Sequence, residues 1–103
     1  MHHVMALYGT PTDPDHFRDY YINTHLHLAA KLPGLRSMHY SFAVETLGEG
    51  PHYFCTWVGQ FDDAAAMGAA MASPAGQALA ADIPNYASGG VTLHHYQAET
   101  PGT

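Results

Sequence analysis

The segment from residue 17 to residue 35, FRDYYINTHLHLAAKLPGL, constrains the fold most because its inward-facing residues recur with the period of a helix. At spacings of three or four residues, one stripe of this helix contains Phe17, Tyr21, Thr24, Leu28 and Leu32. His25 lies on the same stripe, one helical turn beyond Tyr21. The pattern therefore predicts a helix that buries a histidine and a tyrosine side by side.

Strand-like and helix-like segments alternate along the rest of the chain. They are, in order, a strand at 2–9, a helix from its N-cap Asp13 to about Leu32, strands at 35–46 and 52–61 with a hairpin loop at 47–51, helical turns from Asp62 to Pro84, and a strand at 91–97. The order β-α-β-β-α-β is the ferredoxin-like pattern. We expect an α+β fold with a four-stranded antiparallel sheet and both helices on one face, in one domain over residues 1–103 with frayed ends at 1–2 and 98–103.

The charge balance narrows the class of partner. Lys and Arg number three against nine acidic residues, so we expect the chain to bind neither nucleic acid nor anionic membranes. The single cysteine, Cys55, excludes an internal disulfide and suits a reducing compartment. With no basic leader and no apolar run of about 20 residues, the sequence predicts a cytoplasmic protein.

The third strand indicates a sheet that is covered on both faces. Its apolar and aromatic residues fall at both parities, whereas a sheet with one solvated face alternates apolar and polar residues. The low fraction of charged residues also leaves too few to cover both faces of the sheet. We therefore expect two sheets to pack face to face in a homodimer with a barrel-like core.

Two runs of residues resemble the EthD family of the dimeric α+β barrel superfamily. They are YY…TH-x-x-LAAKLPGL in the first helix and ASPAGQALAADIPNYASGGVT late in the chain, and the resemblance extends from about Ala6 to Thr92. The family motif His-x-Pro-Leu is His25-Leu26-His27-Leu28 here, so His27 replaces the usual proline and permits an unbroken helix. The resemblance implies that His25 and Tyr21 line a cavity between helix and sheet.

The candidate catalytic residues are His25 and Tyr21. A histidine can accept or donate a proton near neutral pH, and a tyrosine hydroxyl can donate a hydrogen bond to a developing enolate. The alternative is that His25 is a core residue whose ring nitrogen satisfies a nearby polar group. Candidate substrate-binding residues on the helix stripe and on the strands are Tyr8, Phe17, Leu28, His39 and Trp57.

The histidines do not have the spacing of a metal site. His25 and His27 point about 200° apart on a helix, and adjacent His94 and His95 point to opposite faces of a strand. His2 and His3 begin the strand that should pair with the last strand, so they should lie near that second pair. We expect no metal and no other cofactor.

Cys55 and the methionines favour packing roles. Cys55 is interpreted as a small buried apolar residue rather than a nucleophile. Met67 and Met71, four residues apart, are interpreted as packing of the second helix rather than as a ligand wall.

The resemblance implies a small-molecule enzyme that transfers protons without a cofactor, in an isomerase-, cyclase-, lyase- or monooxygenase-like reaction on an apolar or aromatic metabolite, in a pathway such as ether or aromatic degradation. The alternative is a non-catalytic binding or accessory protein of an oxidative catabolic pathway. A third interpretation is a structural dimer with a filled core. The volume beside His25 distinguishes them, because ligand sites of the first two kinds need open space.

Overall fold

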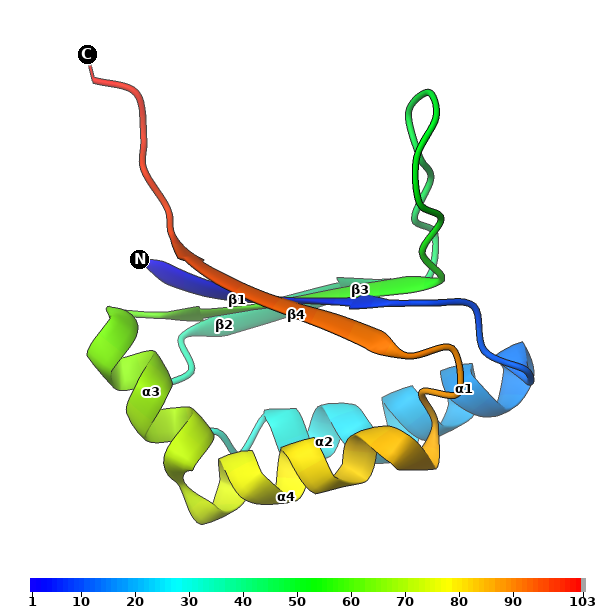
Figure 1. The fold of residues 1–103 in the computed structure, drawn as a ribbon. Coiled ribbons are helices and arrows are strands. Elements are labelled where there is room, and N and C mark those ends of the chain that lie inside the picture. Colours follow the sequence, from blue (N-terminus) through cyan, green and yellow to red (C-terminus); the bar gives the residue numbers. More distant parts are fainter. Residues whose placement is uncertain (103) are drawn as a thin grey trace.

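The computed structural model describes residues 1–102 as two layers, a twisted antiparallel sheet and a set of helices on one of its faces (Figure 1). The strands are β1 (His2–Tyr8), β2 (Ser37–Ser41), β3 (Cys55–Phe61) and β4 (Val91–Gln97). Their order in the sheet is β2-β3-β1-β4, and each neighbouring pair is antiparallel. The predicted ferredoxin-like fold is confirmed.

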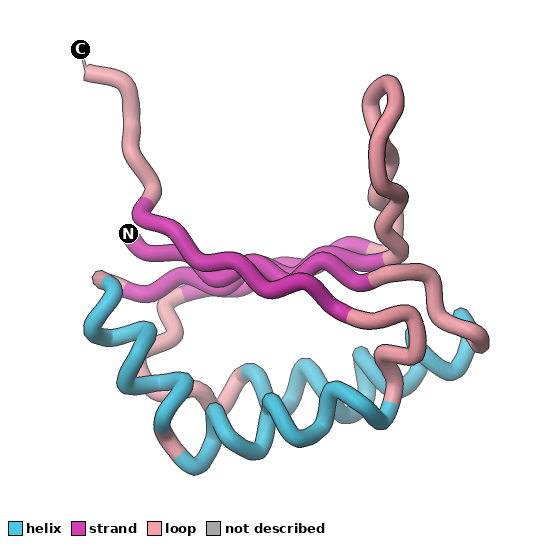
Figure 2. The backbone as a smooth tube through the Cα atoms, in the orientation of Figure 1, coloured by secondary structure: helices cyan, strands magenta, loops and turns pink. Residues whose placement is uncertain are grey.

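The helices form a single layer on one side of the sheet (Figure 2). They are α1 (Pro14–Tyr20), a π-helical turn (Tyr21–His25), α2 (Leu26–Ala29), α3 (Ala64–Ala72), α4 (Pro74–Asp82) and a 3-10 turn (Ile83–Asn85). Asp13 caps α1, as predicted, by accepting a hydrogen bond from the His16 backbone N–H at 3.1 Å. Over residues 1–102, no helix is both long enough and apolar enough to span a membrane.

The π-helical turn shifts the buried stripe of the first helix by one position. Its signature is a hydrogen bond from the backbone N–H of Leu26 to the carbonyl of Tyr21, five residues earlier. This turn takes up one extra residue, so the side chains that face inward after it are His25 and Ala29. Thr24 and Leu28, which an α-helical period places on the stripe, are only half-buried. The helix is unbroken, as expected from His27, but it is not α-helical throughout.

The loop between β2 and β3 is longer than predicted. Strand pairing ends at Ser41 and resumes at Cys55, so residues 42–54 replace the predicted hairpin loop at 47–51. Gly48 and Gly50 have positive φ angles of 73° and 150°, and Pro51 lacks an N–H for a strand ladder. The loop rises from the sheet on the side away from the helices (Figure 1).

The register assigns the strand residues to two faces of the sheet. Tyr40, Trp57, Ala6 and Leu93 form one row across the four strands on the helix-covered face. Because side chains alternate along a strand, the next row of residues lies on the open face. This row consists of His39, Val58, Met5 and His94. Loop 42–54 and the C-terminal tail both stand on this open side (Figure 1).

Candidate functional site

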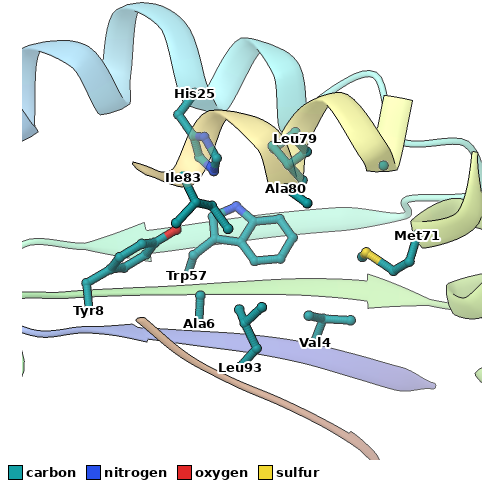
Figure 3. A pocket seen from close by; sticks show the side chains of 12 residues that line it. Val4, Ala6, Tyr8, His25, Trp57, Met71, Leu79, Ala80, Ile83 and Leu93 are labelled. Carbon is teal, nitrogen blue, oxygen red and sulfur yellow. The ribbon is translucent and has the colours of Figure 1, made fainter. Parts of the chain in front are cut away.

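A cavity of about 80 Å³ lies between the sheet and the helices (Figure 3). The cavity exists because several residues that line it are small. They are Ala6, Ala29, Gly76 and Ala80. Larger apolar side chains, among them Leu79 and Ile83, form the remaining walls. The cavity opens to solvent between α4 and β4, where the lining residues Ala80 and Leu93 are exposed.

His25 lines the cavity and forms a buried pair with a carboxylate. Its Nδ1 lies 2.9 Å from Oδ2 of Asp82, the last residue of α4. Both residues are buried, with 4% of His25 and 8% of Asp82 exposed. An ionised carboxylate only accepts hydrogen bonds, so the proton of the imidazole lies on Nδ1. Asp82 therefore fixes both the tautomer and the orientation of the ring.

Asp82 is itself held by two neighbours. The Tyr20 hydroxyl donates to its Oδ1 at 2.5 Å, and the amide of Asn85 donates to the same oxygen at 3.1 Å. Burial alone would raise the pKa of the Asp82 carboxyl, but the hydrogen bonds from Tyr20, His25 and Asn85 outweigh burial and lower it. The carboxyl group is therefore ionised at neutral pH.

The other nitrogen of His25 continues a chain of hydrogen bonds toward the sheet. The Tyr86 hydroxyl lies 2.9 Å from His25 Nε2 and 2.7 Å from the hydroxyl of Tyr8. Since Nδ1 carries the imidazole proton, Nε2 accepts from Tyr86, and the Tyr86 oxygen accepts from Tyr8. Tyr8 lines the cavity from β1. The chain Tyr8–Tyr86–His25–Asp82, which we call the proton chain, thus joins the cavity to a buried carboxylate.

The electrostatics of the proton chain keep His25 neutral and its tyrosines protonated. Burial lowers the pKa of His25, although the hydrogen bond and charge of Asp82 oppose this effect. Burial raises the pKa values of Tyr8 and Tyr86, because both hydroxyls are removed from water. At neutral pH, His25 Nε2 is therefore a base that already accepts one hydrogen bond.

The structure brings three of the sequence-predicted site residues together at the cavity and leaves the others away from it. His25, Tyr8 and Trp57 line the cavity. Leu28 does not, because the π-helical turn places Ala29 there instead. His39 does not either, because it lies on the open face of the sheet and is exposed.

Tyr21 and Phe17 are fully buried beside the cavity rather than in its wall. The predicted neighbourhood of Tyr21 and His25 is correct, since their rings stack with centroids 5.3 Å apart. Phe17 also stacks on Tyr21, with ring centroids 5.3 Å apart. The Tyr21 hydroxyl has no hydrogen-bond partner among residues 1–102. Both side chains support the position of His25 and do not reach the open space.

The sequence interpretation missed Asp82 and Tyr86. A negative charge at the C-terminal end of a helix is unfavourable because it opposes the helix dipole. Asp82 occupies such a position at the end of α4, and this conflict is the signal in the sequence that could have identified it. Tyr86 follows in a loop and carries no comparable signal.

The remaining chemistry-bearing residues fall outside the cavity or act as packing, with one exception. Burial raises the pKa of the Cys55 thiol to about 12, which agrees with a packing role. His2 Nε2 lies 2.9 Å from His95 Nδ1, so these residues are neighbours as expected. Within residues 1–102, no group of three or more His, Cys, Asp or Glu residues could hold a metal ion. Met71, interpreted from the sequence as helix packing, lines the cavity.

A sequence profile described as the EthD domain matches residues 9–90, a range that includes His25, Asp82 and Tyr86. The chain belongs to the EthD family. An uncharacterized 11.0 kDa protein in the thcB-thcC intergenic region of Rhodococcus erythropolis is 34% identical to this EthD protein over 100 residues, 97% of either chain. A crystal structure of an ethyl tert-butyl ether D family protein from Bacillus halodurans is 29% identical, with a TM-score of 0.87, and the match covers 96% of this chain and 99% of that one.

More distant solved structures share the fold with this EthD protein. A dimeric ferredoxin-like protein from Thermobifida fusca is 18% identical, with a TM-score of 0.69 over 94% of this chain and 89% of that one. SnoaB, a cofactor-independent oxygenase from Streptomyces nogalater, is 16% identical, with a TM-score of 0.62 over 97% of this chain and 93% of that one. At these identities the likeness concerns the fold alone.

Proposed function

We propose that this EthD protein is a small-molecule enzyme that transfers protons without a cofactor, on a small apolar or aromatic metabolite bound in the cavity. The observation that carries the proposal is the proton chain, which connects the cavity-lining hydroxyl of Tyr8 to the buried pair of His25 and Asp82. A buried, neutral histidine oriented by a carboxylate is a suitable general base near neutral pH.

The proton path runs outward from His25 to the cavity. A substrate carbon releases its proton to the Tyr8 oxygen while the Tyr8 proton moves to Tyr86 and the Tyr86 proton moves to His25 Nε2. The products of this step are a substrate carbanion or enolate and an imidazolium that Asp82 stabilises. Reversal of the path at another atom completes an isomerisation, cyclisation or lyase step. With dioxygen as co-substrate, the same carbanion is the starting point for a monooxygenase-like reaction.

Hydrogen–deuterium exchange tests this proposal and does not require the natural substrate. Small ketones and lactones would be incubated with the protein in D₂O, and loss of the proton next to the carbonyl would be followed by NMR. We expect His25→Gln and Tyr86→Phe to slow protein-dependent exchange by about 100-fold or more, the usual contribution of a general base.

The matched control for this experiment is His27→Gln, because His27 lies on the same helix and is exposed. It should leave the exchange rate unchanged. Equal exchange rates in the wild type and in His25→Gln would rule out His25 as the base. The folded state of each variant would be checked by its NMR spectrum.

Non-catalytic binding is the second candidate function, and one observation favours it. Both ring nitrogens of His25 already have hydrogen-bond partners within the protein, so neither is free to contact a ligand directly. Under this alternative, ligands bind in the cavity with affinities that survive His25→Gln, and no exchange above the buffer rate occurs.

A homodimer formed through the open face of the sheet completes the proposal. Val58 and Met5 are cross-strand neighbours on this face. Loop 42–54 and the C-terminal tail rise from the same side of the sheet (Figure 1). Leu47, in that loop, is 99% exposed, which is unusual for a large apolar residue and suits a contact with a second copy. The dimeric ferredoxin-like protein from Thermobifida fusca has the same fold.

The oligomeric state of Met5→Asp tests the dimer. A charge at the centre of a buried apolar interface should yield monomers in sedimentation equilibrium. Ala65→Asp, an exposed change on the helix side, should remain dimeric. A wild-type protein that sediments as a monomer would contradict the proposed dimer.

A further inference from the structure

The indole of Trp57 carries a polar hydrogen that the proton chain does not use. Trp57 lies on β3, lines the cavity and is only 6% exposed. Its Nε1 has no hydrogen-bond partner within residues 1–102. Figure 3 shows this nitrogen on the edge of the ring that faces the helices. A buried N–H without an acceptor is unfavourable, so this position calls for an acceptor from outside the chain.

The neighbours of Trp57 hold the indole ring in this orientation. Gly59 lies two residues along β3 on the same face, and a Cβ atom there would be 2.4 Å from Cη2 of the Trp57 ring. The benzo edge of the ring therefore lies directly over the Gly59 backbone. Tyr40 and Ala6 are the cross-strand neighbours of Trp57 on either side. Packing of one edge against the sheet leaves the N–H edge turned toward the cavity.

The other polar groups of the cavity wall are already engaged. The hydroxyl of Tyr8 bonds to Tyr86, and both nitrogens of His25 have partners. Among the lining residues, Trp57 therefore has the one polar hydrogen without a partner in the described chain. A buried water needs two to four polar partners, so an apolar molecule with one oxygen suits this cavity better than water does.

The charges around the cavity set the charge of the ligand. Lys and Arg number three in the sequence, and no lining residue in the described chain is one of them. Arg18 is paired with Asp15 and Arg36 with Asp62, both near the surface. The ionised carboxylate behind His25 opposes a second negative charge nearby. The cavity therefore disfavours carboxylates and phosphates, and a neutral molecule fits it.

We propose that the Trp57 N–H binds the single acceptor oxygen of a small neutral apolar ligand, of the class of cyclic ketones. This inference rests on the proposed small-molecule function and names the chemistry of its ligand. The cavity volume of about 80 Å³ restricts the buried part of the ligand to a small ring or branched group. In the proton-transfer reaction, the same N–H would stabilise the oxygen of an enolate, a role that the sequence had suggested for Tyr21.

The chain contains one tryptophan, so the indole N–H gives a single resonance in a ¹H–¹⁵N spectrum. The probes are cyclopentanone, which is neutral with one acceptor, cyclopentane, which has none, and cyclopentanecarboxylate, which is charged. We expect cyclopentanone to move the indole proton downfield as the hydrogen bond forms. Cyclopentane should perturb cavity methyl signals, such as those of Leu79, without that downfield shift, and the carboxylate should leave both unchanged.

Trp57→Phe supplies the second measurement, because it keeps an aromatic ring and removes the N–H. Ligand-observed NMR should give a dissociation constant for cyclopentanone that is weaker by about tenfold, as expected for one lost hydrogen bond. The dissociation constant of cyclopentane should change by less than about threefold, because it makes no such bond. A Tyr96→Phe variant, which removes an exposed hydroxyl on the open face of the sheet, is the control and should bind both probes as the wild type does.

The possible results separate this inference from the function on which it rests. If cyclopentanone perturbs the cavity methyl signals while the indole proton stays in place, the role of Trp57 is wrong and the small-molecule function stands. An equal loss of affinity for both probes in Trp57→Phe overturns the inference as well, because packing alone would explain it. If none of the probes perturbs any cavity signal, both the inference and the cavity-binding function fail.

Discussion

Two histidines are buried in the described part of this EthD protein, and their surroundings differ sharply. His25 is 4% exposed and His2 is 7% exposed, and each has a ring nitrogen 2.9 Å from its partner. The partner of His25 is the carboxylate of Asp82, whereas the partner of His2 is the imidazole of His95, on the edge strand β4. Burial and hydrogen-bond length are therefore similar at the two positions.

The comparison teaches that the partner, rather than burial, makes a histidine suitable for chemistry. A carboxylate fixes one tautomer and stabilises the imidazolium that forms when the other nitrogen accepts a proton. In a pair of imidazoles either ring can donate or accept, so the pairing of His2 with His95 fixes no tautomer. His25 also lines the apolar cavity between the sheet and the helices, whereas His2 lines a separate pocket at the beginning of β1, beside Asp62 and Asp63. Three sets of substitutions test whether His25 and His2 differ in this way, and they are given in order of decreasing expected effect.

Removing the carboxylate should have the largest effect. Asp82→Ala leaves the buried Nδ1–H of His25 and the half-buried hydroxyl of Tyr20 without an acceptor, so we expect the free energy of unfolding to fall by about 3 kcal/mol. His95→Ala removes the partner of His2, and His95 itself is exposed. This variant should lower the free energy of unfolding by about 1 kcal/mol or less. Urea unfolding at pH 7 measures both. Similar losses in the two variants would remove the distinction between the two histidines.

Removing a single hydroxyl should have an intermediate effect. Tyr86→Phe leaves the buried Tyr8 hydroxyl and His25 Nε2 without a partner, and we expect a loss of about 1–3 kcal/mol in the free energy of unfolding. The matched change near the other pair is Tyr96→Phe, because Tyr96 contacts His3 at an exposed position. It should change stability by about 0.5 kcal/mol or less. A Tyr86→Phe variant as stable as the wild type would show that the proton chain is not held together in solution.

The smallest effect concerns the pH dependence of stability. Burial lowers the pKa of His25 in the folded state, so the unfolded chain binds this proton first as the pH falls. His25 therefore costs stability below about pH 6.5, by at most about 1.4 kcal/mol per pH unit. His25→Gln should flatten the stability profile below that pH, and the exposed His27→Gln should not. Unfolding curves between about pH 5 and pH 7.5 measure this, and parallel profiles for His25→Gln and wild type would contradict it.

The sequence predicted the fold and the buried position of His25 because both follow from local periodicity. Strand and helix signals gave the order β-α-β-β-α-β, and the stripe through Phe17 and Tyr21 indicated which face of the helix is buried. The length of loop 42–54 was missed because its flanking residues are apolar enough to resemble strands, although the pairing of β2 with β3 already ends at Ser41, well before Gly48.

The partners of His25 could not be predicted in the same way. Asp82 and Tyr86 lie 57 and 61 residues away in the sequence, and only the packing of the second helical unit against the first brings them together. Leu28 was assigned to the site because an ideal helical period was assumed, and one extra residue in the π-helical turn put Ala29 in its place. Periodic elements could therefore be predicted from the sequence, whereas the long-range contacts and the irregular helical turn could not.

The π-helical turn also has a consequence for how related sequences should be aligned. It holds one more residue than an α-helical turn, so a relative whose first helix is α-helical throughout can lack one residue there and still direct the equivalent histidine inward. The residue to lose is an outward one such as Ile22, which is 43% exposed. An alignment without a gap between Tyr21 and His25 would then pair His25 of this chain with the wrong column. If a relative has no histidine in the column of His25, a one-residue gap should be tried at this turn before the histidine is counted as absent.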